Sequence, residues 1–239
     1  MSIDENGGKK MKKLIFFSSV VLLVLLMQFC GGRIYTNPIF IEKTMGHRVI
    51  AILPFEMVFT GKQPKKITSQ QIDKIEEVES IAFQNSLFHS LSHQTFKNRD
   101  PVRIDIQPIK KTNRILDENG IGIRDSWDIE SEELARLLNV DAVVRTRVEK
   151  RRYMSDLTSF GLEVGSTVLN ILLDMEDVPF FIFLPTSTNR IRAGCYIYNG
   201  MDGAVLWGYD VVDETDWRMP ANAIVDGVTH HIAKRFPYR

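Results

Sequence analysis

Strand and helix patterns alternate along the chain from residue 48 onward, and their order limits the fold to a few architectures. The run RVIAILP at 48–54 is short, apolar and closed by a proline, which predicts a buried strand. The polar residues around Gly61 and Pro64 predict a loop. Thr68 opens a Thr-x-x-Gln capping box, and apolar residues follow it at the spacing of a long helix. Alternation over 102–107 then predicts a second strand.

A third strand is predicted from DAVVRTRVEKRRY, which follows a short helix that Ser131 can cap. One row of its side chains is apolar, and the opposite row holds Arg145, Arg147 and Arg151. We interpret this arginine row as the solvated face of an edge strand. Contact of the same row with an acidic polymer or protein is the alternative.

The C-terminal part predicts a hairpin and a helix. Alternating runs at 191–198 and 204–212 flank the Gly-rich turn NGMDG, which is typical of an antiparallel hairpin. Pro220 opens the last helix. Strands joined through helices tend to be parallel, whereas the hairpin is antiparallel. We therefore predict an α/β (α+β) fold at 48–239, a single domain with a mixed sheet of about five strands and helices packed on it.

The N-terminus carries an apolar segment from Leu14 to Leu26 that follows Lys-Met-Lys-Lys. This is the pattern of a signal peptide, and the segment is short for a spanning helix, which needs about 20 apolar residues. Met11 is an alternative start to Met1. The next residues, LMQFC, resemble the lipobox of bacterial lipoproteins, in which the cysteine, here Cys30, is diacylated on sulfur (palmitate) and becomes the first residue after cleavage.

The resemblance to a lipobox implies a signal peptide at 1–29, then a lipidated Cys30 and a tether at 30–47. Gly31, rather than Asp, follows the cysteine, and the sorting rule of enteric bacteria then implies the outer membrane, with the domain in the periplasm. The alternative is an uncleaved single-pass anchor that holds the same domain at a membrane.

Three stretches together resemble a known family: RVIAILPFE, LARLLNVDAVVRTRVEK and YIYNGMDGAVLWGYD. In this order they resemble the α/β envelope lipoproteins related to the curli secretion-channel subunit CsgG, LpoB, PelC and the amino-terminal domain of TolB. The resemblance covers roughly the predicted domain. It implies a non-enzymatic protein that builds homo-oligomers or docks onto a protein partner in a secretion, export or cell-wall machine.

An apolar insert at 155–188 departs from the strand and helix pattern and contains Phe180, Phe181 and Phe183. An exposed patch of this kind marks a subunit interface or a membrane contact. We name these residues as candidate interface residues together with Trp207, because aromatic residues are enriched at interfaces. Packing onto the domain's own core is the alternative for the insert and for Trp207.

Catalytic motifs are absent from the sequence: it has no phosphate loop, dinucleotide fingerprint, nucleophile elbow or zinc-protease motif. His89 and His93 share one helix face, but a metal site needs a third or fourth ligand, and none is evident. We therefore predict no catalytic residue, no metal and no cofactor, and keep a metal-dependent enzyme using these histidines as the rival. Cys195 is interpreted as a small buried residue.

Charge excludes one class of partner. The chain has 30 basic and 30 acidic residues. A nucleic-acid-binding protein needs a surplus of clustered Lys and Arg, so no nucleic-acid partner is predicted. The expected function is that of a lipid-anchored envelope protein that self-assembles or docks onto a larger machine, with a monomeric membrane-anchored binding module as the alternative.

Overall fold

The computed structural model describes residues 32–62, 68–97, 104–153, 188–213 and 221–238, and those from Arg33 onward belong to one folded unit. Cys30 and all three candidate interface phenylalanines lie outside the described residues. None of the described helices combines the length and the apolar composition needed to cross a membrane.

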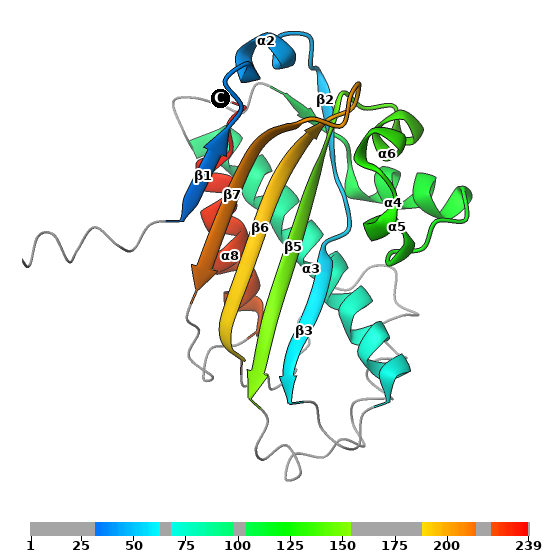
Figure 1. Cartoon of the computed structure of the whole chain (residues 1–239), viewed down its shortest axis with the longest axis vertical. Helices are drawn as coiled ribbons and strands as arrows, with labels where there is room; N and C mark the ends of the chain where they lie inside the picture. The colour runs from blue at the N-terminus through cyan, green and yellow to red at the C-terminus, as the bar shows by residue number, and fades with distance from the viewer. Residues whose placement is uncertain (1–31, 63–67, 98–103, 154–187, 214–220, 239) are drawn as a thin grey trace, which may run out of the picture. The chain divides into compact units, whose positions relative to one another are not determined.

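Seven described strands form one mixed sheet (Figure 1). They are β1 (Arg33–Thr36), β2 (Val49–Ile52), β3 (Glu56–Lys62), β4 (Asp105–Ile106), β5 (Ala142–Tyr153), β6 (Thr188–Asn199) and β7 (Val205–Asp213). The order is β1-β7-β6-β5-β2-β4, and β3 pairs with the second half of β5. β2 pairs in parallel with β4 and β5, and β3 also pairs in parallel with β5. β5, β6, β7 and β1 are antiparallel neighbours.

The predicted fold class is confirmed, but the sheet has two strands that the sequence analysis did not predict. β3 occupies part of the segment interpreted as a polar loop, and it extends the sheet because its backbone pairs with β5 from Arg147 to Tyr153. β1 and the short helix α2 (Phe40–Thr44) lie in the segment interpreted as a tether. All four residues of β1 are exposed, so no alternation of buried and exposed residues marks it in the sequence.

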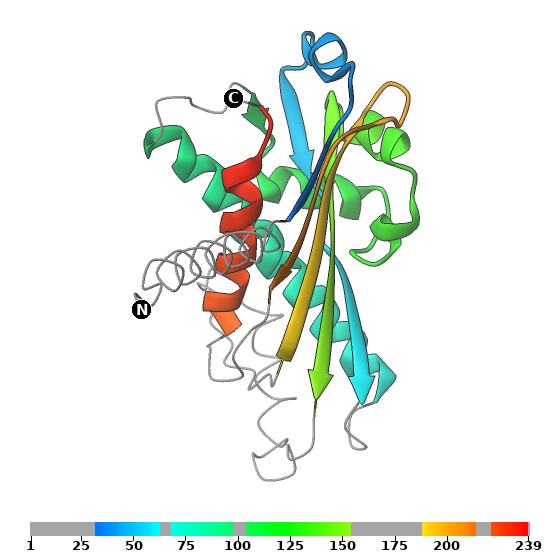
Figure 2. The same cartoon turned by 60° about the vertical axis from the view of Figure 1, so that its left-hand side comes forward.

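Two helices cover one face of the sheet, and three cover part of the other. The long helix α3 (Ser69–Lys97) and the C-terminal helix α8 (Ala221–Arg235) pack on the same face (Figure 2). Helices α4 (Ile109–Glu118), α5 (Asp125–Asp128) and α6 (Ser131–Leu138) lie beside the opposite face. A small core of α4 and α6 side chains with β2 and the start of β5 fills that side: Ala51, Leu53, Leu116, Leu134, Ala135, Leu138 and Val143.

The capping box predicted at the start of α3 is confirmed. The Thr68 N–H donates to Gln71 Oε1 at 2.9 Å, and the Gln71 N–H donates to Thr68 Oγ1 at 3.2 Å. These two bonds satisfy donors at the start of the helix that have no partner within it.

The turn between β6 and β7 is held against the start of β5. The Gly200 N–H donates to the carbonyl of Asp141 at 2.8 Å, and a Cβ on Gly200 would lie 2.8 Å from the same oxygen. Glycine is therefore required by this close approach. The Asp141 carboxylate also accepts from the backbone N–H groups of Arg48 and Val49 at 2.7 and 2.9 Å. These contacts link all three of the stretches that carry the family resemblance.

A buried ion pair joins α3 to β5 inside the larger core. Lys150 Nζ lies 2.6 Å from Glu79 Oε2, and both residues are buried. The ammonium also lies 5.0 Å from the centre of the Phe83 ring, a cation–π contact. The apolar row of β5 thus continues into a lysine whose charge is neutralised by a carboxylate from a helix 71 residues away in the chain.

The C-terminal residues after α8 pack beneath α2. His47 Nδ1 lies 2.8 Å from the hydroxyl of Tyr238, whose ring lies 5.6 Å from that of Phe40. Burial lowers the pKa of His47 below its ordinary value of 6.5, although the Asp141 charge opposes the shift. The folded protein thus favours the neutral imidazole more strongly than the unfolded chain does.

This shift predicts that acidification weakens the fold. A lowered pKa in the folded state contributes stability above the unfolded value of about 6.5. That contribution is lost as the pH falls through this value toward the folded pKa. We expect the free energy of unfolding, measured with urea, to fall between pH 7.5 and pH 5.5 by more in the wild type than in His47→Gln. An equal fall in both proteins would remove His47 as the cause.

Candidate interaction surfaces

Part of the sheet face opposite α3 and α8 is uncovered within the residues that the structure describes. The residues of this open face follow from strand register, because directly paired residues share a face. One row crosses five strands: Arg33 pairs with Asp210, Asp210 with Gly194, Gly194 with Arg147, and Arg147 with Glu56. The members of the open face are Arg33, Tyr35, Glu56, Val58, Thr60, Arg147, Glu149, Arg151, Arg190, Arg192, Gly194, Tyr196, Gly208, Asp210 and Val212.

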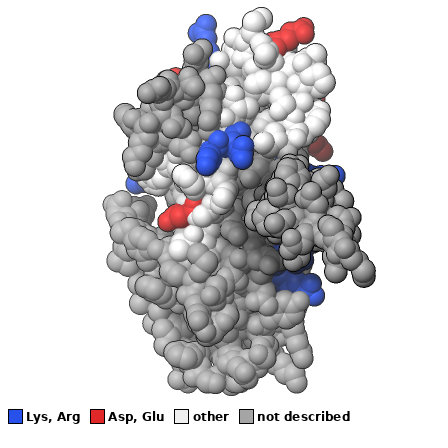
Figure 3. All heavy atoms as spheres, turned by 90° about the vertical axis from the view of Figure 1, so that its left-hand side faces the viewer, with Lys and Arg blue, Asp and Glu red and all other residues white. Residues whose placement is uncertain are grey.

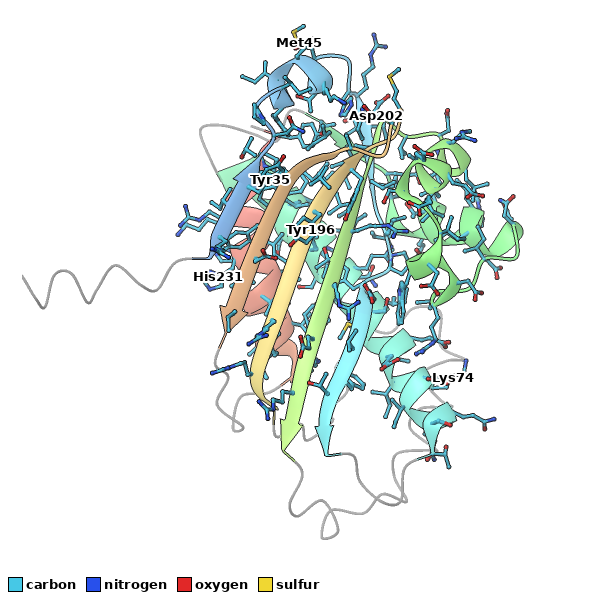
Figure 4. The ribbon with its side chains drawn as sticks, in the orientation of Figure 1. Tyr35, Met45, Lys74, Tyr196, Asp202 and His231 are labelled. Carbon is cyan, nitrogen blue, oxygen red and sulfur yellow. The ribbon has the colours of Figure 1, made fainter. Side chains whose placement is uncertain are left out.

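Tyr196 occupies the centre of the open face (Figure 4). A Cβ on Gly208 would lie 2.6 Å from its ring, and a Cβ on Gly194 would lie 3.0 Å from it. The two glycines therefore leave the space in which the ring lies along the sheet. The Tyr196 hydroxyl donates to Asp210 Oδ1 at 2.6 Å, and this bond, with partial burial, raises the pKa of Tyr196 to about 12. Tyr196 is thus a fixed, neutral phenol at pH 7.

The arginine row of β5 separates into two kinds of residue. The Arg145 guanidinium is partly buried and donates to the carbonyls of Ser126 and Trp127 at 3.0 and 3.1 Å, so it holds α5 on the sheet. Burial also lowers the pKa of Arg145. Arg147 and Arg151 are exposed, and Arg147 forms an ion pair with Glu56.

The interpretation of this strand as an edge strand is wrong. β5 lies inside the sheet, between β6 on one side and β2 and β3 on the other. The sequence shows only which side chains share a face, and this face is solvated although the strand is internal. Arg190 and Arg192 of β6 add two exposed guanidinium groups beside those of β5.

A second set of exposed side chains is apolar and lies in the N-terminal segment of the folded unit. Ile34 is 50% exposed, Ile39 45%, Ile41 77% and Met45 79%. These four residues of β1, α2 and their flanks are named the apolar end. Figure 3 shows the corresponding side, and the described atoms at its top, where α2 lies, are mostly neither basic nor acidic.

An ion pair between Lys43 of α2 and Asp202 fixes α2 beside the turn between β6 and β7. In the same turn Met201 is 92% exposed. The Asn37 amide donates to the carbonyl of Val205 at 3.0 Å and holds the segment between β1 and α2 on β7. The apolar end is therefore a fixed part of the fold, presented by backbone and side-chain bonds.

Trp207, a candidate interface residue, lies in the core with 1% of its surface exposed. Its ring lies 5.9 Å from that of Phe236 and 6.2 Å from that of Tyr209. The alternative of core packing therefore holds for Trp207, because its side of β7 faces α8. The sequence could not separate the two roles, since an aromatic residue in an alternating strand fits either.

Cys195 is fully buried, as predicted, and burial raises the pKa of its thiol to about 12. Among the side chains that the structure describes, no group of three or more His, Cys, Asp and Glu lies close enough to hold a metal ion. His89 is exposed on α3, and the side chain of His93 lies outside the described part.

Comparison with known proteins finds solved structures but no family model and no curated protein. A PelC dodecamer from Paraburkholderia phytofirmans is 11% identical with a TM-score of 0.39, and the match covers 84% of this chain and 93% of that chain. The lipoprotein GNA1162 from Neisseria meningitidis is 10% identical with a TM-score of 0.41, over 79% and 96% of the two chains.

The LpoB C-terminal domain from Salmonella enterica is 8% identical with a TM-score of 0.33, over 74% and 94% of the two chains. PelC and LpoB are two of the proteins that the sequence resembles. Because these TM-scores are below 0.5, no functional residue is transferred from them to this chain.

Proposed function

We propose that the chain is a non-enzymatic lipoprotein of the bacterial cell envelope that works by binding other proteins. Cys30 carries the lipid, and the domain lies on the periplasmic side of the outer membrane. The open face is its binding surface, through which it self-assembles or docks onto a secretion, export or cell-wall machine. An uncleaved N-terminal anchor that holds the same binding surface at a membrane is the second candidate.

The composition of the open face carries this proposal. Tyrosine and arginine are the residue types most enriched among the residues that dominate binding energy at protein interfaces, together with tryptophan. The open face presents Tyr35 and Tyr196 beside five exposed arginines, Arg33, Arg147, Arg151, Arg190 and Arg192. Tyr196 is already held in one orientation by Asp210, so little side-chain entropy is lost when a partner binds it.

The short spacer after Cys30 sets how close the anchored domain lies to the membrane. Only Gly31 and Gly32 separate Cys30 from Arg33, the first residue of β1. Three residues span at most about 11 Å, so an acyl group on Cys30 keeps the sheet edge near the lipid headgroups.

The anchor is tested by the intact mass of the membrane-extracted protein, with Cys30→Ser as control. We expect a wild-type chain that starts at Cys30 and carries added acyl mass, and no acyl mass on Cys30→Ser. A full-length, unmodified chain in both samples would establish the uncleaved anchor instead.

Binding through the open face is tested by reversing one of its charges. We expect Arg192→Glu to weaken self-association, or co-purification with the docking partner, by at least about tenfold, as for an interface arginine worth more than about 1.4 kcal/mol. Arg114→Glu is the matched control, because this arginine of α4 is 68% exposed and lies away from the open face. Multi-angle light scattering of the detergent-extracted protein measures the first property. Equal behaviour of the two variants would contradict the proposal.

A further inference from the structure

The geometry points to a second membrane contact: we propose that the apolar end, formed by Ile34, Ile39, Ile41 and Met45, lies on the lipid surface next to the anchor. The inference rests on the proposed acylation of Cys30. It goes further because it assigns a lipid-binding role to α2 and fixes which side of the domain faces the membrane.

The first step is the short length of chain between Cys30 and the apolar end. Ile34 follows Cys30 by four residues, a distance of at most about 14 Å. β1 then leads directly to Ile39 and α2, and the bonds of Asn37 and Lys43 hold this segment on the sheet. A lipid on Cys30 therefore brings the apolar end to the membrane surface without any change in the fold.

The second step is the side-chain composition of the apolar end. The four exposed side chains are aliphatic or a thioether, and α2 exposes Ile41 while Glu42 and Lys43 supply its polar side. Ile41 and Met45 are four residues apart and so share one side of α2, and amphipathic helices at membranes place their apolar side in the boundary between headgroups and acyl chains. Lys43 is neutralised by Asp202, so no isolated charge has to enter the lipid headgroup region with α2.

The third step is the choice between lipid and a second copy of the chain. Energetically dominant interface residues are enriched in Trp, Tyr and Arg, and the apolar end contains none of these three residue types. The apolar end has the aliphatic composition, whereas the open face has the tyrosines and arginines. An anchored chain also meets lipid at a high effective concentration, whatever its own concentration.

The test is a spin label at Met45→Cys in the acylated full-length protein, reconstituted in vesicles of phosphatidylethanolamine and phosphatidylglycerol. Acylation blocks Cys30, and Cys195 is fully buried, so the new cysteine takes the label. Asp117→Cys on α4 is the control. Asp117 is exposed, and α4 packs beside β2, which β7, β6 and β5 separate from β1 in the sheet (Figure 1). Collisions with oxygen, which is concentrated in lipid, and with a water-soluble nickel chelate are measured at both sites.

We expect the ratio of oxygen to nickel accessibility at Met45 to exceed that at Asp117 by at least about threefold, as for a side chain 5–10 Å into the interface. A label at Ile41→Cys should give the same result, which excludes a local distortion at one site. Mass spectrometry of the same sample separates the two proposals, because a missing acyl group overturns the proposed function itself.

Two results would overturn the lipid contact in an acylated sample. One is an accessibility ratio at Met45 and Ile41 equal to that at Asp117. The other is dipolar broadening of the Met45 spectrum that disappears on dilution with unlabelled protein, since this would mean that a second copy covers the apolar end.

Discussion

Lys150→Met is expected to lower the free energy of unfolding by about 3–5 kcal/mol, because it leaves a buried carboxylate without its neutralising ammonium. Lys150 and Glu79 are 3% and 7% exposed, so water cannot replace the lost contact without opening the core. Methionine fills the volume of the lysine stem and keeps the contact with Phe83, so the loss reports the charge rather than a cavity. Urea unfolding at pH 7.5 measures the change.

The double variant Lys150→Met with Glu79→Leu serves as the control. It removes both charges together, and replacing a buried pair by apolar residues of similar volume is often neutral or stabilising. We expect it to recover most of the stability that Lys150→Met loses. If the double variant is as unstable as the single one, the loss comes from packing on α3 and not from the ion pair.

This ion pair also shows where sequence reasoning reaches its limit. Alternation along β5 correctly separates its two faces, because side-chain direction in a strand depends only on position. It does not show that Lys150, on the buried row, meets Glu79 of α3, because that contact depends on how the helix crosses the sheet. Gln84 is a similar case: it is buried, and its amide donates to the carbonyl of Ile52 at 2.8 Å.

The two unpredicted strands fail to show in the sequence for different reasons. β3 is seven residues long but too mixed in composition to be recognised by itself, and it forms because β5 continues beyond β2 and offers a row of backbone groups with which β3 pairs. β1 is fully exposed and contributes no buried residue, so only backbone pairing with β7 defines it. Capping boxes and hairpin turns, by contrast, are local, and the capping box at Thr68 and the hairpin are confirmed. The prediction that Ser131 caps its helix is wrong, because Ser131 is the first residue of α6 and its side chain makes no capping bond.

The candidate surfaces were predictable only in part. The arginine row and the alternating run that contains Tyr196 are visible in the sequence, but the row formed across β1, β7, β6, β5 and β3 depends on register. In the sequence, Gly194 and Gly208 are only residues with low strand propensity. The structure shows why they are glycines, because a Cβ at either position would meet the ring of Tyr196. The apolar end was hidden because the segment before residue 48 was interpreted as a tether.

Trp207→Ala is expected to lower the free energy of unfolding by about 3–5 kcal/mol, since it removes the largest fully buried side chain among the described residues and leaves a cavity. The indole packs between the sheet and the residues after α8, against Phe236 and Tyr209. Losing it should therefore also loosen the C-terminal residues beneath α2. Trp207→Phe should lose less, because a smaller ring still fills part of the site.

Tyr35→Ala is the matched comparison for Trp207→Ala. Tyr35 is 49% exposed on β1, so its removal should change the free energy of unfolding by no more than about 0.5 kcal/mol, as is usual at the surface. The pair of variants separates core from interface when urea unfolding and light scattering are measured on the same samples. A Trp207→Ala protein with wild-type stability but altered assembly would mean that Trp207 is an interface residue and not a core residue. A Tyr35→Ala protein with wild-type stability but weaker association would place the binding energy on the open face, where Tyr35 and Tyr196 flank Gly208 in one row.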